Sequence, residues 1–451
     1  MGAFIQTLNG YLWGFPLIAF LFLTHIVMTV KTGLIQRKVF LGIRLSLSGD
    51  KGGEGEISPF SALATSLAST LGTGNIIGVG TAVALGGAGA VFWCWITGIL
   101  GMATQYCECF LSVRYRQQTA DGYSGGPMYV LEKGVGSRRL GVFYALLASL
   151  GGLITGAAIQ SNSISNVILE TVRSRNTIAN HKVLSFAIGV VTATLAALVI
   201  FGGLKSISRV CSFFVPFMAL AYTLGCFAVL FINRDVVIES LVVIIKEAFS
   251  MRAVSGGAFG SVMMLSCRYG VARGLFSNEA GIGTSSVISA SAHTSSPVRQ
   301  GLVSMTATFW DTVVMCLITG VVIVSSIITD DASVSAADSG SLCYDAFCRI
   351  PVVGEGLLVF SIVVFAFSTV LGWSAVGEKC IAYVFGDVSV RWYRGAWIGA
   401  VFLAPMISLE GIWDLGDLVN ALLVAPNVLG LLLLSSQVRA ATRKEIDNIR
   451  A

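Results

Sequence analysis

The stretch STLGTGNIIGVG, residues 69–80, interrupts a run of apolar sequence that is otherwise long enough to cross a membrane. Its four glycines are Gly72, Gly74, Gly78 and Gly80. Glycine inside a helix costs about 1 kcal/mol relative to alanine, and polar Thr70, Thr73 and Asn75 interrupt the hydrocarbon run further. Irregular backbone at this depth is tolerated only where it faces protein or a water-filled cavity. The stretch therefore predicts a helix that is broken near its middle for a functional reason.

The composition places the whole chain in a membrane. The chain has 451 residues, of which 55% are hydrophobic and 12% are charged, whereas a soluble protein carries roughly 25% charged residues. Its mean hydropathy is +0.81. Lysine and arginine number 29 against 24 aspartate and glutamate, which gives no clustered basic face for nucleic acid. We therefore expect lipid, and not nucleic acid, to surround the chain.

Eleven segments have the roughly 20 apolar residues that a transmembrane helix needs. They are residues 11–31, 60–85, 88–113, 141–170, 182–202, 208–232, 256–277, 300–328, 354–384, 394–410 and 413–437. Charges are spread through the segment 233–252, which predicts an amphipathic helix at the membrane interface. The fold class predicted is an all-α integral membrane protein with about eleven spans.

The distribution of lysine and arginine predicts the orientation, because these residues favour cytoplasmic loops. With the N-terminus outside, the inner segments are 31–57, 114–139, 203–209, 268–299, 379–394 and 439–451. They carry 22 of the 29 basic residues, and 7 fall outside. The sequence therefore predicts an external N-terminus and a cytoplasmic C-terminus.

The spans also predict an internal duplication. Without the first span, ten remain, and two halves of five spans must run in opposite directions. The segments expected are an extra helix and basic loop (1–58), a first repeat (59–232), an external linker (233–255), a second repeat (256–438) and a tail (439–451). The second repeat begins with a stretch that contains Gly256, Gly257 and Gly260. Paired glycine-interrupted spans are typical of a transporter binding site, so we expect the second break at 255–260.

Sequence patterns for catalysis or metal binding are weak. GYSGG, residues 122–126, fits the hydrolase pattern G-x-S-x-G, but no strand–helix context surrounds it. Gly72, Gly74 and Gly78 are spaced G-x-G-x-x-x-G, which does not match the dinucleotide fingerprint. Most of the ten cysteines lie in apolar runs without zinc spacing, so we interpret them as small core residues. Cys343 and Cys348 share a polar loop, where a disulfide is an open alternative.

Four long motifs closely resemble one known family. They are STLGTGNIIGVGTAVALGGAGAVFWCWITG, GYSGGPMYVLEKG, RYGVARGLFSNEAGIGT and FSTVLGWSAVGEKC. In this order they resemble the alanine or glycine:cation symporter family, over about residues 11–440. The resemblance implies the leucine-transporter fold preceded by one extra helix, in a bacterial inner membrane. It also implies sodium-coupled symport of small neutral amino acids, with Na⁺ as the coupling ion and no other cofactor. A monomer is the working expectation.

The break can accommodate both charges of an amino acid. The half-helix that begins near Ile76 presents free N–H groups and the positive end of its dipole to a carboxylate, so we expect Thr73, Gly74 and Asn75 at the substrate. The half that ends near Leu71 presents carbonyl groups, which suit a hard cation. Asn75 has two open roles, at the substrate or at a second sodium ion.

The remaining site residues come from the resemblance. By analogy with the fold, the carbonyl groups of Ala68 and Leu71 and the hydroxyls of Ser368 and Thr369 would surround one sodium ion. The family resemblance favours Gln160, Thr369 and Trp373 near the substrate, with Gln160 and the Thr369 carbonyl accepting from its ammonium group. Trp373 would limit the room for the side chain. Thr369 thus has two candidate roles.

Charged residues in or near the spans remain ambiguous. Asp311 falls well inside a span and is either functional or a structural partner of a neighbouring hydroxyl. We expect it outside the site, because its span follows the predicted broken helix. Arg273 and Glu279 suggest an inner gate or a loop ion pair, and Glu378 and Lys379 suggest interfacial anchors.

Other function classes are weaker. A passive channel would favour a continuous polar stripe, whereas polarity here is concentrated at mid-span. A membrane enzyme would need a complete catalytic set, and the chain shows none, so we expect no enzymatic activity. Alanine, glycine and serine cannot be ranked, because one methylene is worth only about 1–3 kcal/mol in such pockets. Proton coupling and D-enantiomers remain alternatives.

Overall fold

The computed structural model describes residues 2–50, 52–119, 122–174, 180–250, 262–330, 340–407 and 411–446. The described chain is all-helical apart from one short antiparallel hairpin, β1 (Gln117–Thr119) and β2 (Gly122–Ser124). The helices of the first half are α1 (Gly2–Leu12), α2 (Phe15–Lys31), α3 (Val39–Leu47), α4 (Pro59–Thr70), α5 (Ile77–Gly86), α6 (Gly89–Arg114), α7 (Pro127–Tyr129), α8 (Arg138–Gly151), α9 (Gln160–Ser174), α10 (His181–Ile200) and α11 (Gly203–Ile232).

The second half repeats the all-helical character. Its helices are α12 (Val237–Ala248), α13 (Val262–Asn278), α14 (Thr284–Ser289), α15 (Pro297–Thr308), α16 (Leu317–Asp330), α17 (Leu342–Cys348), α18 (Gly354–Phe385), α19 (Val388–Leu403) and α20 (Ile412–Glu445). A 3-10 turn lies between α4 and α5, at Thr73–Asn75. The π-helical turns Gly152–Ile159 and Phe309–Cys316 join α8 to α9 and α15 to α16, so each of these pairs forms one long rod.

A helix lies in each of the eleven predicted spans. By length and composition, six helices can cross a membrane, or up to eight if each bent pair is one span. Each bent pair consists of helices joined at a sharp angle: α2 with the segment Ile35–Leu47, and α4 with the segment Thr73–Gly86. The predicted class, an all-helical membrane protein with broken helices, is therefore confirmed.

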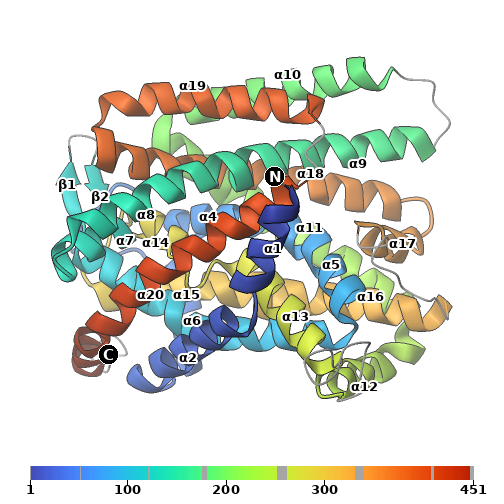
Figure 1. Cartoon of the computed structure of the whole chain (residues 1–451), viewed down its shortest axis with the longest axis horizontal. Coiled ribbons are helices and arrows are strands. Elements are labelled where there is room, and N and C mark those ends of the chain that lie inside the picture. Colours follow the sequence, from blue (N-terminus) through green and yellow to red (C-terminus); the bar gives the residue numbers. More distant parts are fainter. Residues whose placement is uncertain are drawn as a thin grey trace.

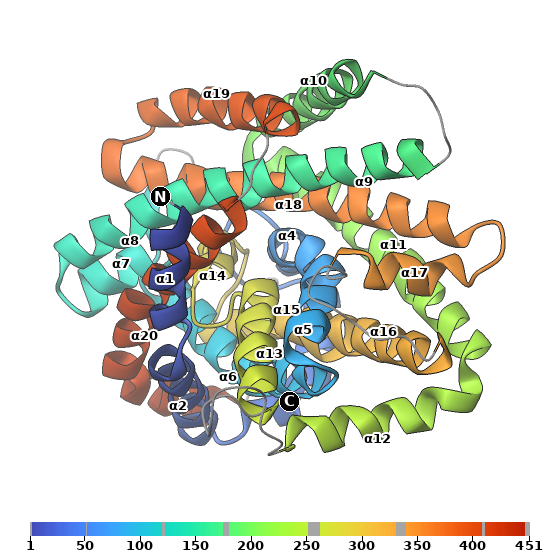
Figure 2. The same ribbon diagram turned by 45° about the vertical axis from the view of Figure 1, so that its right-hand side comes forward.

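The short helices that carry the breaks lie inside a shell of longer ones. In Figures 1 and 2, α4, α5, α13 and α14 occupy the middle of the molecule, while α10 and α19 lie side by side along one edge. Beneath that pair, α9 and α18 cross the molecule together. The long helices thus hold the bent pair of α4 and α5 in the protein interior, where its free backbone groups can be used.

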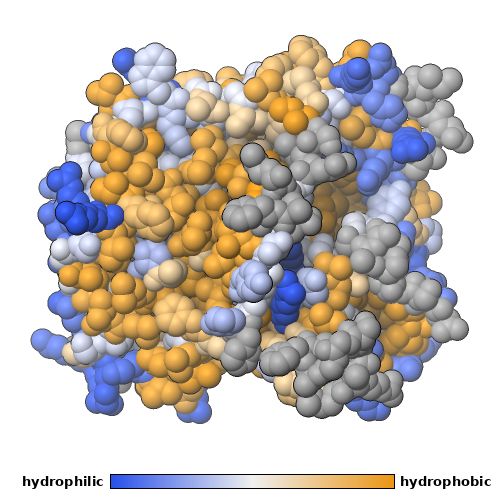
Figure 3. All heavy atoms as spheres, in the orientation of Figure 1, coloured by the Kyte–Doolittle hydropathy of each residue, from blue (hydrophilic) through white to orange (hydrophobic). Residues whose placement is uncertain are grey.

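An apolar belt covers the outside of this shell. Figure 3 shows hydrophobic residues across the broad middle of one face, with hydrophilic residues gathered mainly towards its edges. On α11, large side chains such as Phe213, Phe217, Leu224 and Phe231 are between 52% and 70% exposed. Surfaces this apolar face lipid and not water, so this is a multi-pass membrane protein.

The linker predicted as amphipathic forms α12, at the periphery in both ribbon views. Its Ile238 and Ile245 side chains are exposed, while Ser240 and Ile244 are buried. Glu247 Oε2 accepts a hydrogen bond from the Ala88 N–H at 2.8 Å, and the Ala248 carbonyl accepts one from Trp93 Nε1 at 3.0 Å. These contacts dock the amphipathic helix on the turn between α5 and α6.

The structure bears on the predicted second break, on the Cys343–Cys348 pair and on two of the basic residues used for the orientation. The glycines of 255–260, where the second break was predicted, lie outside the described residues. Cys343 and Cys348 are both free thiols, one buried and one exposed, so the disulfide is absent from the structure. Arg268 and Arg273, counted above as inner-loop residues, lie within α13 because that helix extends to Asn278. Without them the predicted inner segments still hold 20 basic residues.

Candidate functional site

The first broken helix has the interruption that the glycine-rich stretch predicts. Ser58 caps α4 by accepting from the Ser61 N–H at 3.1 Å, and the helix axis bends by 61° between α4 and the following half. At the bend, Gly72 allows α18 to approach closely. A Cβ atom on Gly72 would lie 2.6 Å from Thr369 Oγ1 and 3.5 Å from Gln160 Oε1. The break therefore sits directly against the predicted site residues of α9 and α18.

The Asn75 side chain stabilises the break by hydrogen bonds to Gly72 and to Asp311. Its Oδ1 accepts from the Gly72 N–H at 3.1 Å, and its Nδ2 donates to Asp311 Oδ1 at 2.8 Å and to the Asp311 carbonyl at 3.1 Å. The Asn75 side chain is fully buried and does not line the small cavity that lies beside this break. It fixes the turn between the two half-helices and links that turn to the π-helical segment Phe309–Cys316.

A second break, which the sequence reasoning missed, lies at residues 279–283, between α13 and α14. Glu279, Gly281 and Gly283 have φ values of +56°, +106° and +86°, a region that favours glycine and strains glutamate. Glu108 Oε1 accepts from the Gly281 N–H at 2.8 Å, and Glu279 accepts from the Thr284 hydroxyl. Glycines two residues apart in SNEAGIGT were the signal that could have found this break.

Asp311 lies directly behind the first break, although it does not line the cavity. Its carboxylate is fully buried and accepts from Asn75 of the first break, from Ser277 Oγ at 2.9 Å and from Thr312 Oγ1 at 2.6 Å. Ser277 is the penultimate residue of α13, directly before the second break. Packing of the α15–α16 rod against both breaks, which span order does not show, brings Asp311 there. Among the described residues, no lysine or arginine forms an ion pair with it.

A small cavity with mostly buried wall residues lies between the two breaks. Its volume is about 20 Å³, close to the room that one water molecule needs. It is lined by Ser69, Thr70, Gly72, Gly74, Thr155, Gln160, Phe276, Glu279, Thr369, Trp373 and Asn420. Four of the predicted substrate residues, Gly74, Gln160, Thr369 and Trp373, are therefore in its wall. Thr155, Phe276, Glu279 and Asn420 are wall residues that the sequence reasoning did not select.

Gln160 joins the wall to the first break. Its Oε1 accepts from Thr73 Oγ1 at 3.2 Å, and its Nε2 donates to the Thr155 carbonyl at 3.3 Å. Trp373 fits closely against the π-helical turn, because a Cβ atom on Gly156 would lie 2.4 Å from Trp373 Cβ. Gly156 thus permits the indole to lie deep in the wall, where it limits the width of the cavity.

The residues predicted to bind sodium are only partly brought together. Thr369 Oγ1 lies 3.4 Å from the Leu71 carbonyl oxygen and donates to the Phe365 carbonyl at 3.0 Å. Ser368 Oγ donates to the same Phe365 carbonyl at 2.8 Å and lies 3.5 Å from Met218 Sδ. Ala68 is beside α18, because a Cβ atom on Gly372 would lie 3.0 Å from its carbonyl carbon. Thr369 and Leu71 are in contact, whereas the Ser368 hydroxyl is turned toward α11.

One side of the cavity is closed by an aromatic pair and an ion pair. Phe276, in the wall, packs against Trp413 with ring centroids 5.5 Å apart. About one helical turn before Phe276 on α13, Arg273 pairs with Asp417 at 3.0 Å, and both side chains are mostly buried. The predicted alternatives for Arg273 and Glu279 were an inner gate and a loop ion pair. The ion-pair alternative is wrong, because Arg273 lies within α13 and pairs with Asp417, whereas Glu279 lies beyond the end of that helix.

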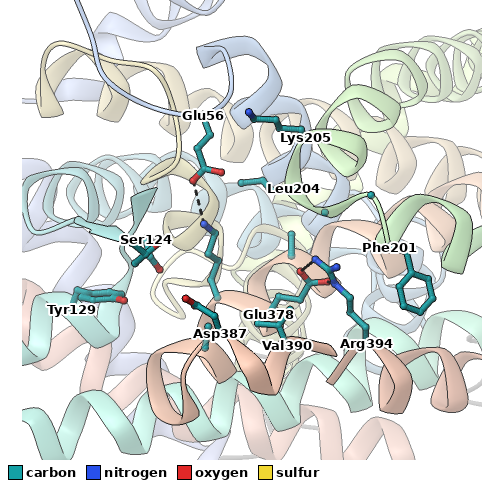
Figure 4. A pocket seen from close by; sticks show the side chains of 16 residues that line it. Glu56, Ser124, Tyr129, Phe201, Leu204, Lys205, Glu378, Asp387, Val390 and Arg394 are labelled. Carbon is teal, nitrogen blue, oxygen red and sulfur yellow. Dashed lines mark hydrogen bonds and ion pairs between the residues drawn. The ribbon is translucent and has the colours of Figure 1, made fainter. Parts of the chain in front are cut away.

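A polar vestibule of about 400 Å³ lies next to the C-terminal part of α18, beyond Trp373. Figure 4 shows charged side chains converging on it from several elements. Lys379 pairs with Glu56 at 3.3 Å and donates to the Tyr123 carbonyl at 2.9 Å, while Arg394 forms a two-pronged pair with Glu378 at 2.7 and 2.8 Å. Glu378 and Lys379 are therefore vestibule residues held in ion pairs, and not free interfacial anchors.

The vestibule is close to the cavity along the helix. Trp373 is in the cavity wall and Ala375, two residues further on α18, lines the vestibule. The Glu56 pair ties α18 to the segment before α4, and Glu56 Oε1 also accepts from the Tyr123 N–H at 2.7 Å. On the hairpin, the hydrogen bond from the Tyr123 hydroxyl to Glu54 raises the pKa of Tyr123. The Lys379–Glu56 ion pair and the Tyr123 contacts thus hold α18 against its neighbours beside the vestibule, on the side of the cavity that the vestibule approaches.

The lipid belt, the two broken helices and the small polar cavity define a membrane carrier. The model of the sodium:alanine symporter family matches residues 1–449, and the chain belongs to this family of cation-coupled amino acid symporters. It is a transporter and not an enzyme.

Two related proteins are similar in sequence to this chain over nearly its whole length. The chain is 38% identical to the sodium/alanine symporter AgcS of Methanococcus maripaludis, over 99% of this chain and 97% of that protein. It is 37% identical to an uncharacterized transporter of Haemophilus influenzae, over 99% and 96%. In structure it is similar to MhsT in complex with L-phenylalanine, with a TM-score of 0.62, 13% identity, and coverage of 85% and 90%. That likeness shows the shared leucine-transporter fold.

Proposed function

We propose that this chain is a sodium-coupled symporter of small neutral amino acids, alanine and glycine, which it carries into a bacterial cell across the inner membrane. The observation that carries the proposal is the small polar cavity between two broken helices, with Gln160, Thr369 and Trp373 in its wall. The relative from Methanococcus maripaludis is named a sodium/alanine symporter. The N-terminus is placed outside and the C-terminus in the cytoplasm, from the excess of basic residues in the predicted inner segments.

The substrate carboxylate is proposed to bind at the start of the second half of the first span. The N–H groups of Thr73 and Gly74 precede the hydrogen-bonded ladder of α5, and the positive end of the α5 dipole favours an anion there. The ammonium group would donate to Gln160 Oε1 and to the Thr369 carbonyl. Asn75 positions these groups by holding Gly72, and Trp373 in the wall limits the room for the substrate side chain.

Sodium is proposed to bind where carbonyl groups leave the α4 ladder. Leu71 O accepts only the long contact from Thr369 Oγ1 among the described residues, so it is available to a hard cation. Ala68, Ser368 and Thr369 would complete that site after the Ser368 hydroxyl turns from Phe365. A second proposed site for sodium is the Asp311 carboxylate, beside Asn75 and Ser277. A cation there would compensate a buried negative charge that no described basic residue pairs.

Coupling follows if one segment contacts both ligands. Residues 71–75 offer a carbonyl group toward the cation and N–H groups toward the carboxylate, so binding of one ligand orders the segment for the other. Such coupling is reciprocal for the two affinities. Inward sodium movement also gains about 2.3 kcal/mol per 100 mV of membrane potential. Alternating access would open the Arg273–Asp417 side and the vestibule in turn.

Ligand-induced stabilisation tests the proposal on purified protein. A ligand that binds only the folded state raises the free energy of unfolding, by about 2.7 kcal/mol at a hundredfold excess over Kd, and therefore raises the melting temperature. We expect alanine and glycine to raise it in sodium and to have little effect in choline. Phenylalanine is the control for size. Equal shifts from alanine in sodium and in choline would contradict sodium coupling.

A second prediction concerns the vestibule. Lys379→Met removes the tie from α18 to Glu56 and Tyr123, and a partly buried ion pair of about 1 kcal/mol corresponds to a roughly fivefold change in population. We expect thiol labelling of a cysteine introduced at Ala375 to become about fivefold faster. Lys205→Met is the matched control, because Lys205 lines the same vestibule and no ion pair of it is recorded in the described chain.

The reversed pair provides the decisive comparison for that prediction. In Glu56→Lys with Lys379→Glu, opposite charges again face each other, so labelling should return toward the wild-type rate. Unchanged labelling in Lys379→Met, or an equal increase in Lys205→Met, would show that this ion pair does not hold the vestibule side closed.

A further inference from the structure

Asn420 carries an unsatisfied polar atom at the wall of the central cavity. The residue lies on α20, is 4% exposed and lines the cavity together with Gln160 and Trp373. Its Oδ1 is buried and has no hydrogen-bond partner within the described structure. Buried polar atoms are paired in the great majority of cases, and each exception needs a reason. An exception in the wall of a ligand cavity indicates that the ligand supplies the partner.

The other polar residues on this face of α20 already have partners. Asp417 precedes Asn420 by three residues and Asn427 follows it by seven, so all three lie on one side of the helix. Asp417 is paired with Arg273. Asn427 Nδ2 donates to Glu108 Oε1 at 2.6 Å and to the Gly281 carbonyl at 2.9 Å. These two side chains hold α20 against α13 and the second break, which leaves Asn420 as the cavity-wall residue on this face whose side-chain oxygen has no partner in the described chain.

Asn420 is separate from the groups proposed for the charged ends of the substrate. The carboxylate is assigned to the break after α4, and the ammonium group to Gln160 and Thr369. Asn420 comes from α20, where Gly416, one turn earlier, packs against Thr155: a Cβ atom there would lie 3.0 Å from Thr155 Cγ2. With Phe276 and Trp373, Asn420 and Thr155 form the part of the wall left for the substrate side chain.

We infer that Asn420 Oδ1 accepts a hydrogen bond from a hydroxyl group on the substrate side chain, so that the transporter recognises serine. The inference rests on the proposed function, because it takes the cavity as the amino acid site. A hydroxymethyl group is the smallest side chain with a donor, and Phe276 and Trp373 beside Asn420 in the wall limit the room for a larger one. An apolar side chain of the same size would leave Oδ1 buried and unpaired, and this is how a polar site rejects analogues that lack the hydroxyl.

Serine and 2-aminobutyrate provide the test, because they differ only by a hydroxyl in place of a methyl group. Each is used to compete with radiolabelled alanine for sodium-driven uptake into proteoliposomes. In the wild-type protein we expect serine to compete at a concentration at least tenfold lower than 2-aminobutyrate. Asn420→Leu, which has a similar volume and no acceptor, should abolish or reverse this preference, which is read as the ratio of the two competing concentrations within one variant. Asn420→Ala provides the same comparison if the leucine variant fails to fold.

The outcomes separate this inference from the proposed function. An unchanged preference for serine in both Asn420 variants would overturn the role of Asn420 and leave symport intact. No preference for serine in the wild-type protein would do the same. Wild-type protein that takes up neither alanine nor serine would overturn the proposed function, and the inference with it. Asn420→Gln is expected to recover part of the serine preference, which a merely structural residue would not show.

Discussion

Asp311→Asn is expected to raise the sodium concentration needed for half-maximal alanine uptake by at least a hundredfold. The substitution keeps the size of the side chain and most of its hydrogen-bonding capacity, but it removes the negative charge. The charge is fully buried, and Asn75, Ser277 and Thr312 direct hydrogen bonds to it. Removing one partner of a buried charge pair costs about 3–5 kcal/mol, which corresponds to a hundredfold or larger loss of affinity for a cation seated there.

The measurement is uptake as a function of sodium concentration, together with the melting temperature of each protein. Asp345→Asn is the matched control, because Asp345 is an exposed carboxylate on α17, and its sodium dependence should stay within twofold. Wild-type sodium dependence in Asp311→Asn would remove Asp311 from the cation site. A lower melting temperature with unchanged sodium dependence would assign Asp311 a structural role only.

Gly72→Ala is expected to reduce alanine uptake at least a hundredfold while the protein still folds. The backbone of Gly72 has a φ of −128° and a ψ of −154°, an extended conformation that alanine adopts without strain. The added Cβ would lie 2.6 Å from Thr369 Oγ1, so the Thr369 side chain must shift and its contact with the Leu71 carbonyl is disturbed. The loss therefore comes from displaced site groups, and a misplacement of about 1 Å is enough for effects of this size.

A glycine in the same stretch is the control for that substitution. Gly78 lies on α5, where the nearest atom to an added Cβ is Arg273 Cδ at 3.9 Å, an ordinary contact distance. Gly78→Ala should keep uptake within about twofold, and the helix propensity of alanine favours folding. Equal uptake by Gly72→Ala and wild-type protein would show that the close approach of Thr369 to the break is not needed for transport.

Much of the architecture could be predicted because it depends on local sequence. Apolar length predicts spans, and four glycines among polar residues predict the break at Gly72–Asn75, since both effects act within one segment. Gln160, Thr369 and Trp373 were chosen by family resemblance, and the structure brings them to one cavity. Their roles in binding stay predictions.

The missed parts depend on packing between distant segments. Asp311 reaches Asn75 across 236 positions in the sequence, and nothing in the order of the spans indicates that contact. The break at residues 279–283 falls in a segment that the basic-residue pattern predicts as an inner loop, and the glycines at 255–260 are the stronger local signal for a second break. Asn420 is a single amide in a long helix, and only its cavity and its missing partner distinguish it from a structural residue. Such features become visible when the neighbouring helices are in place.

Sodium-driven alanine uptake into proteoliposomes tests the central claim most directly. The vesicles contain purified protein, and an inward gradient of sodium is compared with an equal gradient of choline, with Gly72→Ala as the inactive control. Sodium is expected to drive transient accumulation of alanine above its external concentration, and choline to give only the signal of the control. Alanine uptake of the same rate and extent in choline would contradict the sodium-coupled account.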